Sequence, residues 1–152
     1  MTFPTEALRA AIAHCEAAYP NEGCGVFLQE PSGELRARPM ANVVDKYHAR
    51  DPQRFPRTAR TAYLFDPREQ MEVFDGPEKV VCVFHSHADV GAYFSEEDRT
   101  MALMEGQPVL PGVSYLVISV RTKADDLKVF TWTGAEFEEV AVPLPEPGPA
   151  SP

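Results

Sequence analysis

The sequence predicts one domain of mixed α and β structure (the α+β class), in which helices flank a largely antiparallel sheet. Apolar residues recur at helical spacing in some stretches, and elsewhere they alternate or run on continuously as in strands. The chain of 152 residues has the length of one domain, and 44% hydrophobic residues suffice for an ordinary core. We expect residues 1–142 to form this domain and residues 143–152, which include five prolines, to form an extended tail.

Three segments have the pattern of helices, namely residues 5–19, 67–74 and 95–105. Thr5 is placed to cap the first of them. Asp66 is placed to cap the second, and the proline that follows it suits the first position of a helix. Ser95 is placed to cap the third, and we assign Met101, Leu103 and Met104 to its apolar side.

Seven segments are predicted to be strands: residues 25–30, 34–43, 63–65, 79–84, 114–120, 126–133 and 136–142. The first two are joined by the turn Pro31-Ser32-Gly33 and should form a hairpin. Residues 79–84 are an almost continuous apolar run, which predicts a central strand buried on both faces. The last segment is expected at an edge of the sheet.

Residues 44–60 have no clear period, and we predict a long loop that carries five Lys and Arg residues. One interpretation is a solvated connection, because loops lie on the surface. The other is a basic loop that contacts substrate on an otherwise acidic protein. The sequence leaves both interpretations open.

The charge and cysteine content exclude several classes of protein. A formal net charge of -9 argues against nucleic acid or an anionic membrane as the main partner, because both require a basic face. The three cysteines, Cys15, Cys24 and Cys82, fit neither a disulfide framework nor a zinc site made of cysteines alone. No signal-peptide pattern and no run of about 18 apolar residues occurs. We therefore expect a cytoplasmic protein with reduced thiols.

The stretch HSHADVGAYFSEEDR, residues 85–99, gathers several side chains of the kind that bind metal ions. His85 and His87 are two apart directly after the central strand, so both imidazoles can face the same point. A catalytic zinc ion needs three protein ligands and one open position. Asp98 can supply the third ligand from the first turn of the helix that Ser95 caps.

Each part of this pattern also has an ordinary structural explanation. Ser-Glu-Glu-Asp at residues 95–98 is a common start of a helix, with a serine cap and acids that the helix dipole favours. A glutamate in a glycine-rich turn at the entrance of a strand, as Glu22 is, is often a solvated loop acid. The whole string after an apolar strand is much more specific than its parts, and Glu22 would then be the base that hydrolysis requires.

The stretch NEGCG at residues 21–25, followed by HSHADVGAYFSEED, resembles the JAMM or MPN-plus zinc metalloprotease family in its short bacterial form. The residues that match the family signature are Glu22, His85, Ser86, His87, Ser95 and Asp98. YLFDPREQM, residues 63–71, is also similar to the family. Ala88 departs from it, since many members have proline there, and neither the length of 44–60 nor the proline-rich tail belongs to the pattern.

The resemblance implies the cytidine deaminase-like fold of this family and a specific chemistry. Zn²⁺ would be held by His85, His87 and Asp98, Glu22 would be the general base, and the Ser95 hydroxyl would stabilise the oxyanion. Ser86, which faces away, would support the loop. The reaction implied is that of a deubiquitinase-like isopeptidase or peptidase, acting on the Gly-Gly tail of a ubiquitin-like or sulfur-carrier protein.

Three other functions remain possible. A non-catalytic scaffold with this fold is one, and a zinc amidohydrolase that acts on a small molecule is another. A thiol protease based on Cys24 is disfavoured, because the flanking glycines suit a small buried residue and no histidine has a visible pairing role. His14 and His48 are interpreted as structural or solvated.

Overall fold

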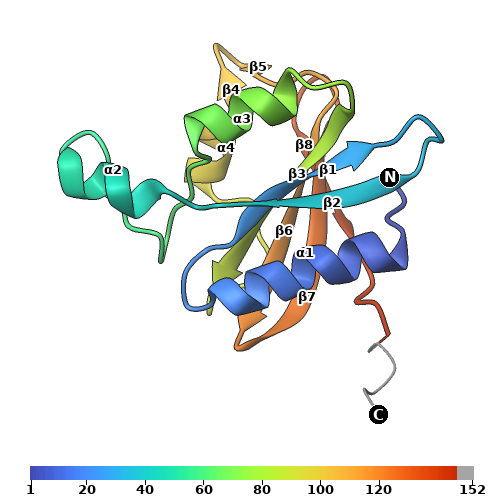
Figure 1. Ribbon diagram of the computed structural model, residues 1–152, viewed down its shortest axis with the longest axis horizontal. Helices are drawn as coiled ribbons and strands as arrows, with labels where there is room; N and C mark the ends of the chain where they lie inside the picture. Colours follow the sequence, from blue (N-terminus) through green and yellow to red (C-terminus); the bar gives the residue numbers. More distant parts are fainter. Residues whose placement is uncertain (147–152) are drawn as a thin grey trace.

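The computed structural model describes residues 1–146, and its centre is one six-stranded sheet with the strand order β2-β1-β3-β6-β7-β8 (Figure 1). These strands are β1 Cys24–Gln29, β2 Leu35–Met40, β3 Lys79–Ala88, β6 Ser114–Arg121, β7 Lys123–Trp132 and β8 Phe137–Ala141. Every neighbouring pair is antiparallel except β3 and β6, which are parallel. The predicted fold class is therefore confirmed.

Four helices and a small hairpin complete the fold. They are α1 Thr5–Ala18, α2 Val44–Arg50, α3 Pro67–Phe74, α4 Glu96–Ala102, and the two-residue strands β4 Leu103–Met104 and β5 Gln107–Pro108. Helix α2 projects from the body of the molecule (Figure 1). None of the helices in the described part of the chain combines the length and apolarity that crossing a membrane requires.

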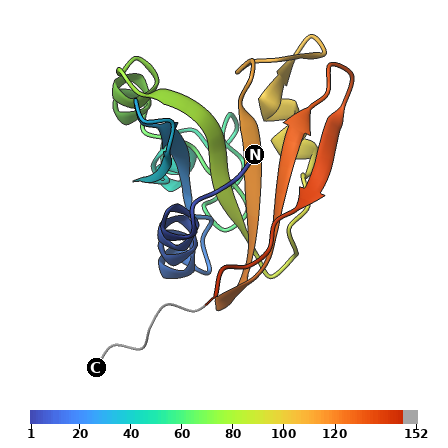
Figure 2. The same ribbon diagram turned by 90° about the vertical axis from the view of Figure 1, so that its right-hand side faces the viewer.

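Alternating residues of the sheet pack into two separate cores, one on each face. On β6, Leu116 and Ile118 face helix α1, which packs through Leu8 and its neighbours. Tyr115 and Val117 face the other way, toward a core that includes residues of α3 and α4. Helices α1 and α4 accordingly lie well apart, at lower left and upper right in Figure 2.

The central strand is longer than predicted. β3 continues through His85–Ala88, because these residues pair with β6, with His85 opposite Val117 and His87 opposite Ser119. The two histidines thus lie within the strand and not after it. The ladder with β6 satisfies backbone groups there, although pairing with β1 ends at His85, so polar side chains do not end the strand.

Several local predictions were wrong. Residues 44–60 include helix α2, and residues 63–65 contribute only an isolated bridge between Asn42 and Phe65. Thr5 makes no side-chain cap, because Pro4 occupies the cap position of α1. Helix α4 ends at Ala102, and the chain turns into the β4–β5 hairpin. Met101 and Met104 are 64% and 69% exposed, and Leu103 and Met104 lie in β4 beyond the helix, so the predicted apolar side of the helix does not form.

Of the predicted tail at 143–152, residues 143–146 are described and belong to no helix or strand, and the rest lies outside the described residues. Arg9 of α1 donates two hydrogen bonds to the Glu146 carbonyl, at 3.1 Å and 2.7 Å. Phe3 and Leu144 line the same surface depression beside β7 and β8. The boundary after residue 142 stays a prediction.

Candidate metal centre

The two histidines of the signature lie on an interior strand and share one face of the sheet. His85 is fully buried and His87 is 4% exposed, because β1 and β6 flank β3 and a core covers this face. Their Nε2 atoms approach each other to 3.2 Å. Side chains at positions i and i+2 of a strand point the same way, which is what makes this convergence possible.

Asp98 reaches the same point from helix α4. One carboxylate oxygen lies 3.1 Å from His85 Nε2, and the other lies 3.1 Å from His87 Nε2. A capping box fixes the start of the helix, in which Ser95 Oγ accepts from the Asp98 amide and Asp98 Oδ2 accepts from the Ser95 amide, each at 3.0 Å. The Asp98 carboxylate is therefore both a helix cap and a partner of the histidines.

These three side chains fit a metal ion. Their ligand atoms all lie within 4.8 Å of one another. Burial raises the pKa of Asp98, but His85 and His87 outweigh it and hold that pKa well below its usual range. Burial lowers the pKa of His85, yet the facing carboxylate makes the net change a rise. Two imidazole nitrogens and a carboxylate aimed at one point are the donor set that a divalent cation such as zinc uses.

The outer contacts of the two imidazoles differ. His87 Nδ1 lies 3.1 Å from the carbonyl of Gly91, so it donates a proton there and leaves Nε2 free as a ligand. His85 Nδ1 has no hydrogen-bond partner among the described atoms. Its ring is instead stacked on Tyr63, with the centroids 4.6 Å apart and the planes 23° apart. The sequence reasoning did not find this role of Tyr63, although it noted the stretch 63–71.

Glu22 is held beside the centre by its backbone and not by its carboxylate. Its amide donates to the Ala59 carbonyl at 2.7 Å, and its carbonyl accepts from Asn42 Nδ2 at 2.9 Å. The next residue, Gly23, is tied to β3 twice: its amide donates to Ser86 Oγ at 2.8 Å and its carbonyl accepts from the Ser86 amide at 3.0 Å. Ser86 thus faces away from the histidines and anchors the turn that carries Glu22.

The Glu22 carboxyl has the protonation behaviour of a general base. It is 6% exposed, and burial raises its pKa to about 7 against the opposing effect of His85 and His87. A base with a pKa near the working pH can both accept and return a proton. Perturbed groups of this kind concentrate at functional sites, because function requires them and stability does not.

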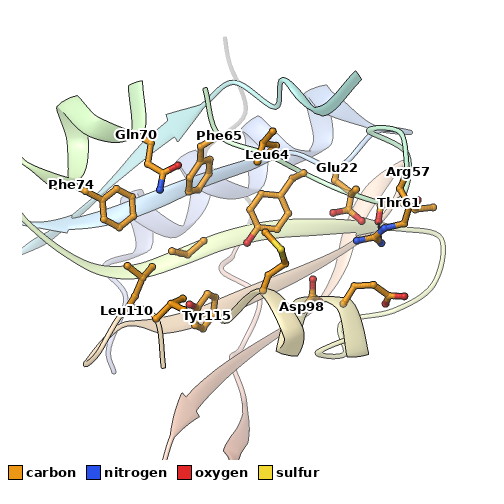
Figure 3. Close-up of a pocket in the computed structure, with 16 residues that line it drawn as sticks. Glu22, Arg57, Thr61, Leu64, Phe65, Gln70, Phe74, Asp98, Leu110 and Tyr115 are labelled. Atoms are coloured by element: carbon orange, nitrogen blue, oxygen red, sulfur yellow. Dashed lines mark hydrogen bonds between the residues drawn. The ribbon is translucent and has the colours of Figure 1, made fainter. Parts of the chain in front are cut away.

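A cavity of about 280 Å³ opens over this centre (Figure 3). One end is polar and is lined by Glu22, Arg57, Thr61 and Asp98, and the other end is lined by Gln70, Phe74, Leu110 and Tyr115. The cavity is thus walled by segments far apart in the chain, including α4 and the residues that directly follow β5. Sequence reasoning did not single out Arg57, which was one of five basic residues in the stretch 44–60.

The remaining candidates have the following contacts. Ser95 Oγ serves as the cap of α4. Cys24 is fully buried, and burial raises the pKa of its thiol far above the ordinary value, which is the reverse of an activated nucleophile. His14 Nε2 contacts the Met40 carbonyl at 3.1 Å, and His48 Nδ1 contacts the Phe55 carbonyl at 2.7 Å.

Known proteins match this chain in both sequence and fold. A family model for prokaryotic homologs of the JAB domain matches residues 4–133. CysO-cysteine peptidases of Mycobacterium bovis and Mycobacterium tuberculosis are 31% identical over 128 residues, which are 80% of this chain and 74% of those proteins.

Two solved structures share the fold. Protein DSY2949 from Desulfitobacterium hafniense gives a TM-score of 0.61 at 24% identity, covering 88% of this chain and 85% of that one. AF2198, a JAB1/MPN domain protein from Archaeoglobus fulgidus, gives 0.51 at 16% identity, covering 91% and 95%. These findings confirm the resemblance seen in the sequence: the chain belongs to the family of prokaryotic homologs of the JAB domain.

Proposed function

We propose that the protein is a zinc-dependent peptidase that cleaves a peptide or isopeptide bond at the C-terminal tail of a sulfur-carrier or ubiquitin-like protein. The observation that carries this proposal is the convergence of His85, His87 and Asp98 beside a buried carboxyl, that of Glu22, with a pKa of about 7. The relatives named CysO-cysteine peptidase support peptidase activity. The class of substrate rests on the resemblance of the sequence, including the Gly-Gly tail.

The metal would be held by the Nε2 atoms of His85 and His87 and by the carboxylate of Asp98. A zinc ion there supplies Lewis acidity, which polarises the scissile carbonyl and makes an attacking water more acidic. The buried setting strengthens these effects, because little solvent competes with the charges. His87 is kept in the required tautomer by the Gly91 carbonyl.

Glu22 would move the proton. Its carboxylate accepts a proton from the attacking water and later gives it to the departing amine. A pKa of about 7 suits both steps, since neither protonation state is strongly favoured near neutral pH. The ties of Gly23 to Ser86 keep the carboxyl near the centre without occupying its oxygens.

Ser95 would stabilise the oxyanion. Its Oγ accepts a hydrogen bond from the Asp98 amide, so the hydroxyl proton stays available for donation. A hydroxyl whose oxygen is fixed in this way is preorganised to meet negative charge that develops on the substrate.

Metal content of the purified protein tests the proposal, together with cleavage of a carrier protein that carries a C-terminal extension. We expect about one zinc ion per chain in the wild type. His87→Ala and Asp98→Ala should lose both the metal and the activity, because each removes a ligand. Glu22→Gln should keep the metal and lose most of the turnover.

His14→Ala is the matched control, because it removes a histidine that lies outside the centre. It should keep both zinc and activity. No zinc in the wild type after zinc addition would contradict the proposal and favour a scaffold. Cleavage of small amides without any cleavage of carrier fusions would instead point to a small-molecule amidohydrolase.

A further inference from the structure

The polar end of the cavity contains an arginine that this mechanism does not use. Arg57 is the one basic residue among those described that line the cavity, where it lies with the acidic residues Glu22, Glu97 and Asp98. Its guanidinium is turned toward the interior, near Glu22 and Thr61 (Figure 3). A cation therefore faces the space in which the substrate would react.

Most N–H groups of this guanidinium have no hydrogen-bond or ion-pair partner among the described residues. One of its nitrogens, Nη1, donates to the Thr61 carbonyl, and no carboxylate of the described residues lies within ion-pair distance. The neighbouring Arg60 differs, because it pairs with Asp89 at 3.9 Å. A guanidinium has five N–H donors arranged as a planar fork, which matches a carboxylate with two parallel hydrogen bonds. The side chain is thus held in place and still able to bind an anion.

The position of this fork relative to Glu22 indicates which anion it would bind. Arg57 and the Glu22 carboxyl line the same polar end of the cavity, with Thr61 beside them (Figure 3). Glu22 would hand its proton to the departing amine. In a single amino acid the amine and the α-carboxylate are joined by one carbon atom, so Glu22 and Arg57 can engage both groups of the same residue.

We propose that Arg57 is a specificity residue, which binds the α-carboxylate of the departing residue and so selects tails in which one amino acid follows the scissile bond. This inference rests on the proposed function and deepens it. In the reaction the tail amide C–N bond breaks, and the oxygen of water becomes part of the new carboxylate of the tail. The departing amine takes the proton from Glu22, and the amino acid leaves with its own carboxylate intact.

The shape of the cavity agrees with this orientation. The end away from Arg57 is lined by Phe74 and Leu110 together with Gln70 and Tyr115, and it can take the tail on the other side of the scissile bond. Among the described lining residues, that end has no basic side chain to pair with a free carboxylate. A longer peptide beyond the scissile bond would place an uncharged amide beside Arg57, and the charge-assisted hydrogen bonds that a carboxylate accepts would not form.

A pair of synthetic peptides tests the inference. Both end in Gly-Gly-Ala, one with a free carboxylate and the other with an amide. We would measure kcat and KM on the zinc-loaded protein, and binding to the zinc-loaded Glu22→Gln variant by fluorescence anisotropy. The wild type should prefer the free acid by roughly 10- to 100-fold, the range for a hydrogen bond to a charged group. The effect should fall mainly on KM.

Arg57→Gln should abolish this preference by weakening only the free acid, and Arg57→Lys should retain part of it as a point charge. Arg50→Gln is the matched control, because it removes one exposed positive charge of the same segment outside the cavity. It should keep the full preference. Retention of that preference in Arg57→Lys also shows that the loop still folds.

Equal treatment of acid and amide by the wild type would overturn the inference, as would an unchanged preference in Arg57→Gln. If both peptides are cleaved equally, the peptidase function stands and the role of Arg57 fails. If the acid is bound through Arg57 without being cleaved, the carboxylate site stands and the peptidase function fails.

Discussion

Burial of the Glu22 carboxyl destabilises the folded protein when this group is ionised. Its pKa is raised from 4.5 to about 7, so the folded chain holds this proton more tightly than the unfolded chain does. The stability from this group is therefore complete below pH 4.5 and is lost as the pH rises through 7. With about 1.4 kcal/mol for each unit of pKa, the loss amounts to at most about 3 kcal/mol.

We predict that Glu22→Gln makes the metal-free protein more stable than the wild type by about 2–3 kcal/mol at pH 8. The reason is that a neutral amide has no charge to desolvate. At pH 4 the two proteins should be equally stable, because Glu22 is then protonated. Urea unfolding at pH 4, 6 and 8 after treatment with a chelator measures the difference.

Glu97→Gln is the control, since Glu97 lines the same cavity but is exposed. It should leave the free energy of unfolding nearly unchanged at every pH. Equal stability of wild type and Glu22→Gln at pH 8 would show that the Glu22 carboxyl is not desolvated.

Helix α4 shows how one short element serves both the fold and the centre. It has only seven residues, too few to be stable alone, so its capping box determines where Asp98 points. Ser95 contributes its backbone amide to the Asp98 carboxylate and its hydroxyl to the Asp98 amide. Substitution of the side chain removes only the second contact.

Ser95→Ala should therefore keep zinc while lowering the free energy of unfolding by about 1 kcal/mol, the usual contribution of such a cap. Turnover should fall on the order of a hundredfold, as for the loss of one oxyanion donor. Zinc analysis, urea unfolding and kcat on one carrier substrate check these three results. Ser95→Thr keeps a hydroxyl and should retain most of the stability and most of the turnover of the wild type. A near-normal rate in Ser95→Ala would leave Ser95 as a cap alone.

The elements differ in how well their sequence predicted them. The apolar run at 79–84 identified the central strand, but its polar end was missed, because backbone pairing with β6, and not the side-chain pattern, extends β3 through Ala88. Helix α2 was missed because it buries only Val44 and so has no apolar period. The spacing of the signature correctly indicated that His85, His87 and Asp98 would meet.

Contacts between distant segments were not predictable from one sequence. Tyr63 stacks on His85, and Arg57 enters the cavity, from positions that no spacing rule connects to the strand. The hydrogen bond from the Asn42 side chain to the Glu22 carbonyl was equally unpredictable, because no spacing rule connects these two positions. Such residues support a site through tertiary packing, and their sequence pattern is that of any loop.

At the scale of the whole molecule, the centre exists only when the fold is assembled. Its ligand candidates come from an interior strand and a helix, and the cavity walls come from the segment at 57–65, α3, α4 and the residues that directly follow β5. In the unfolded chain His85 and His87 remain close because they are two residues apart, but no contact holds Asp98 beside them. A metal ion should therefore bind the folded chain in preference and stabilise it.

We predict that zinc at about 100 times its dissociation constant stabilises the protein by about 2.7 kcal/mol. For a chain of this length that corresponds to a rise of roughly 5–10 °C in Tm over the chelator-treated protein. Thermal unfolding with zinc and with chelator measures the shift. Asp98→Asn removes the anionic ligand but keeps an oxygen that can still cap α4, so it should fold and show little of the shift. His14→Ala should show all of it. A full shift in Asp98→Asn would mean that zinc stabilises the fold from another place, because the proposed centre needs the carboxylate to neutralise the charge of the ion.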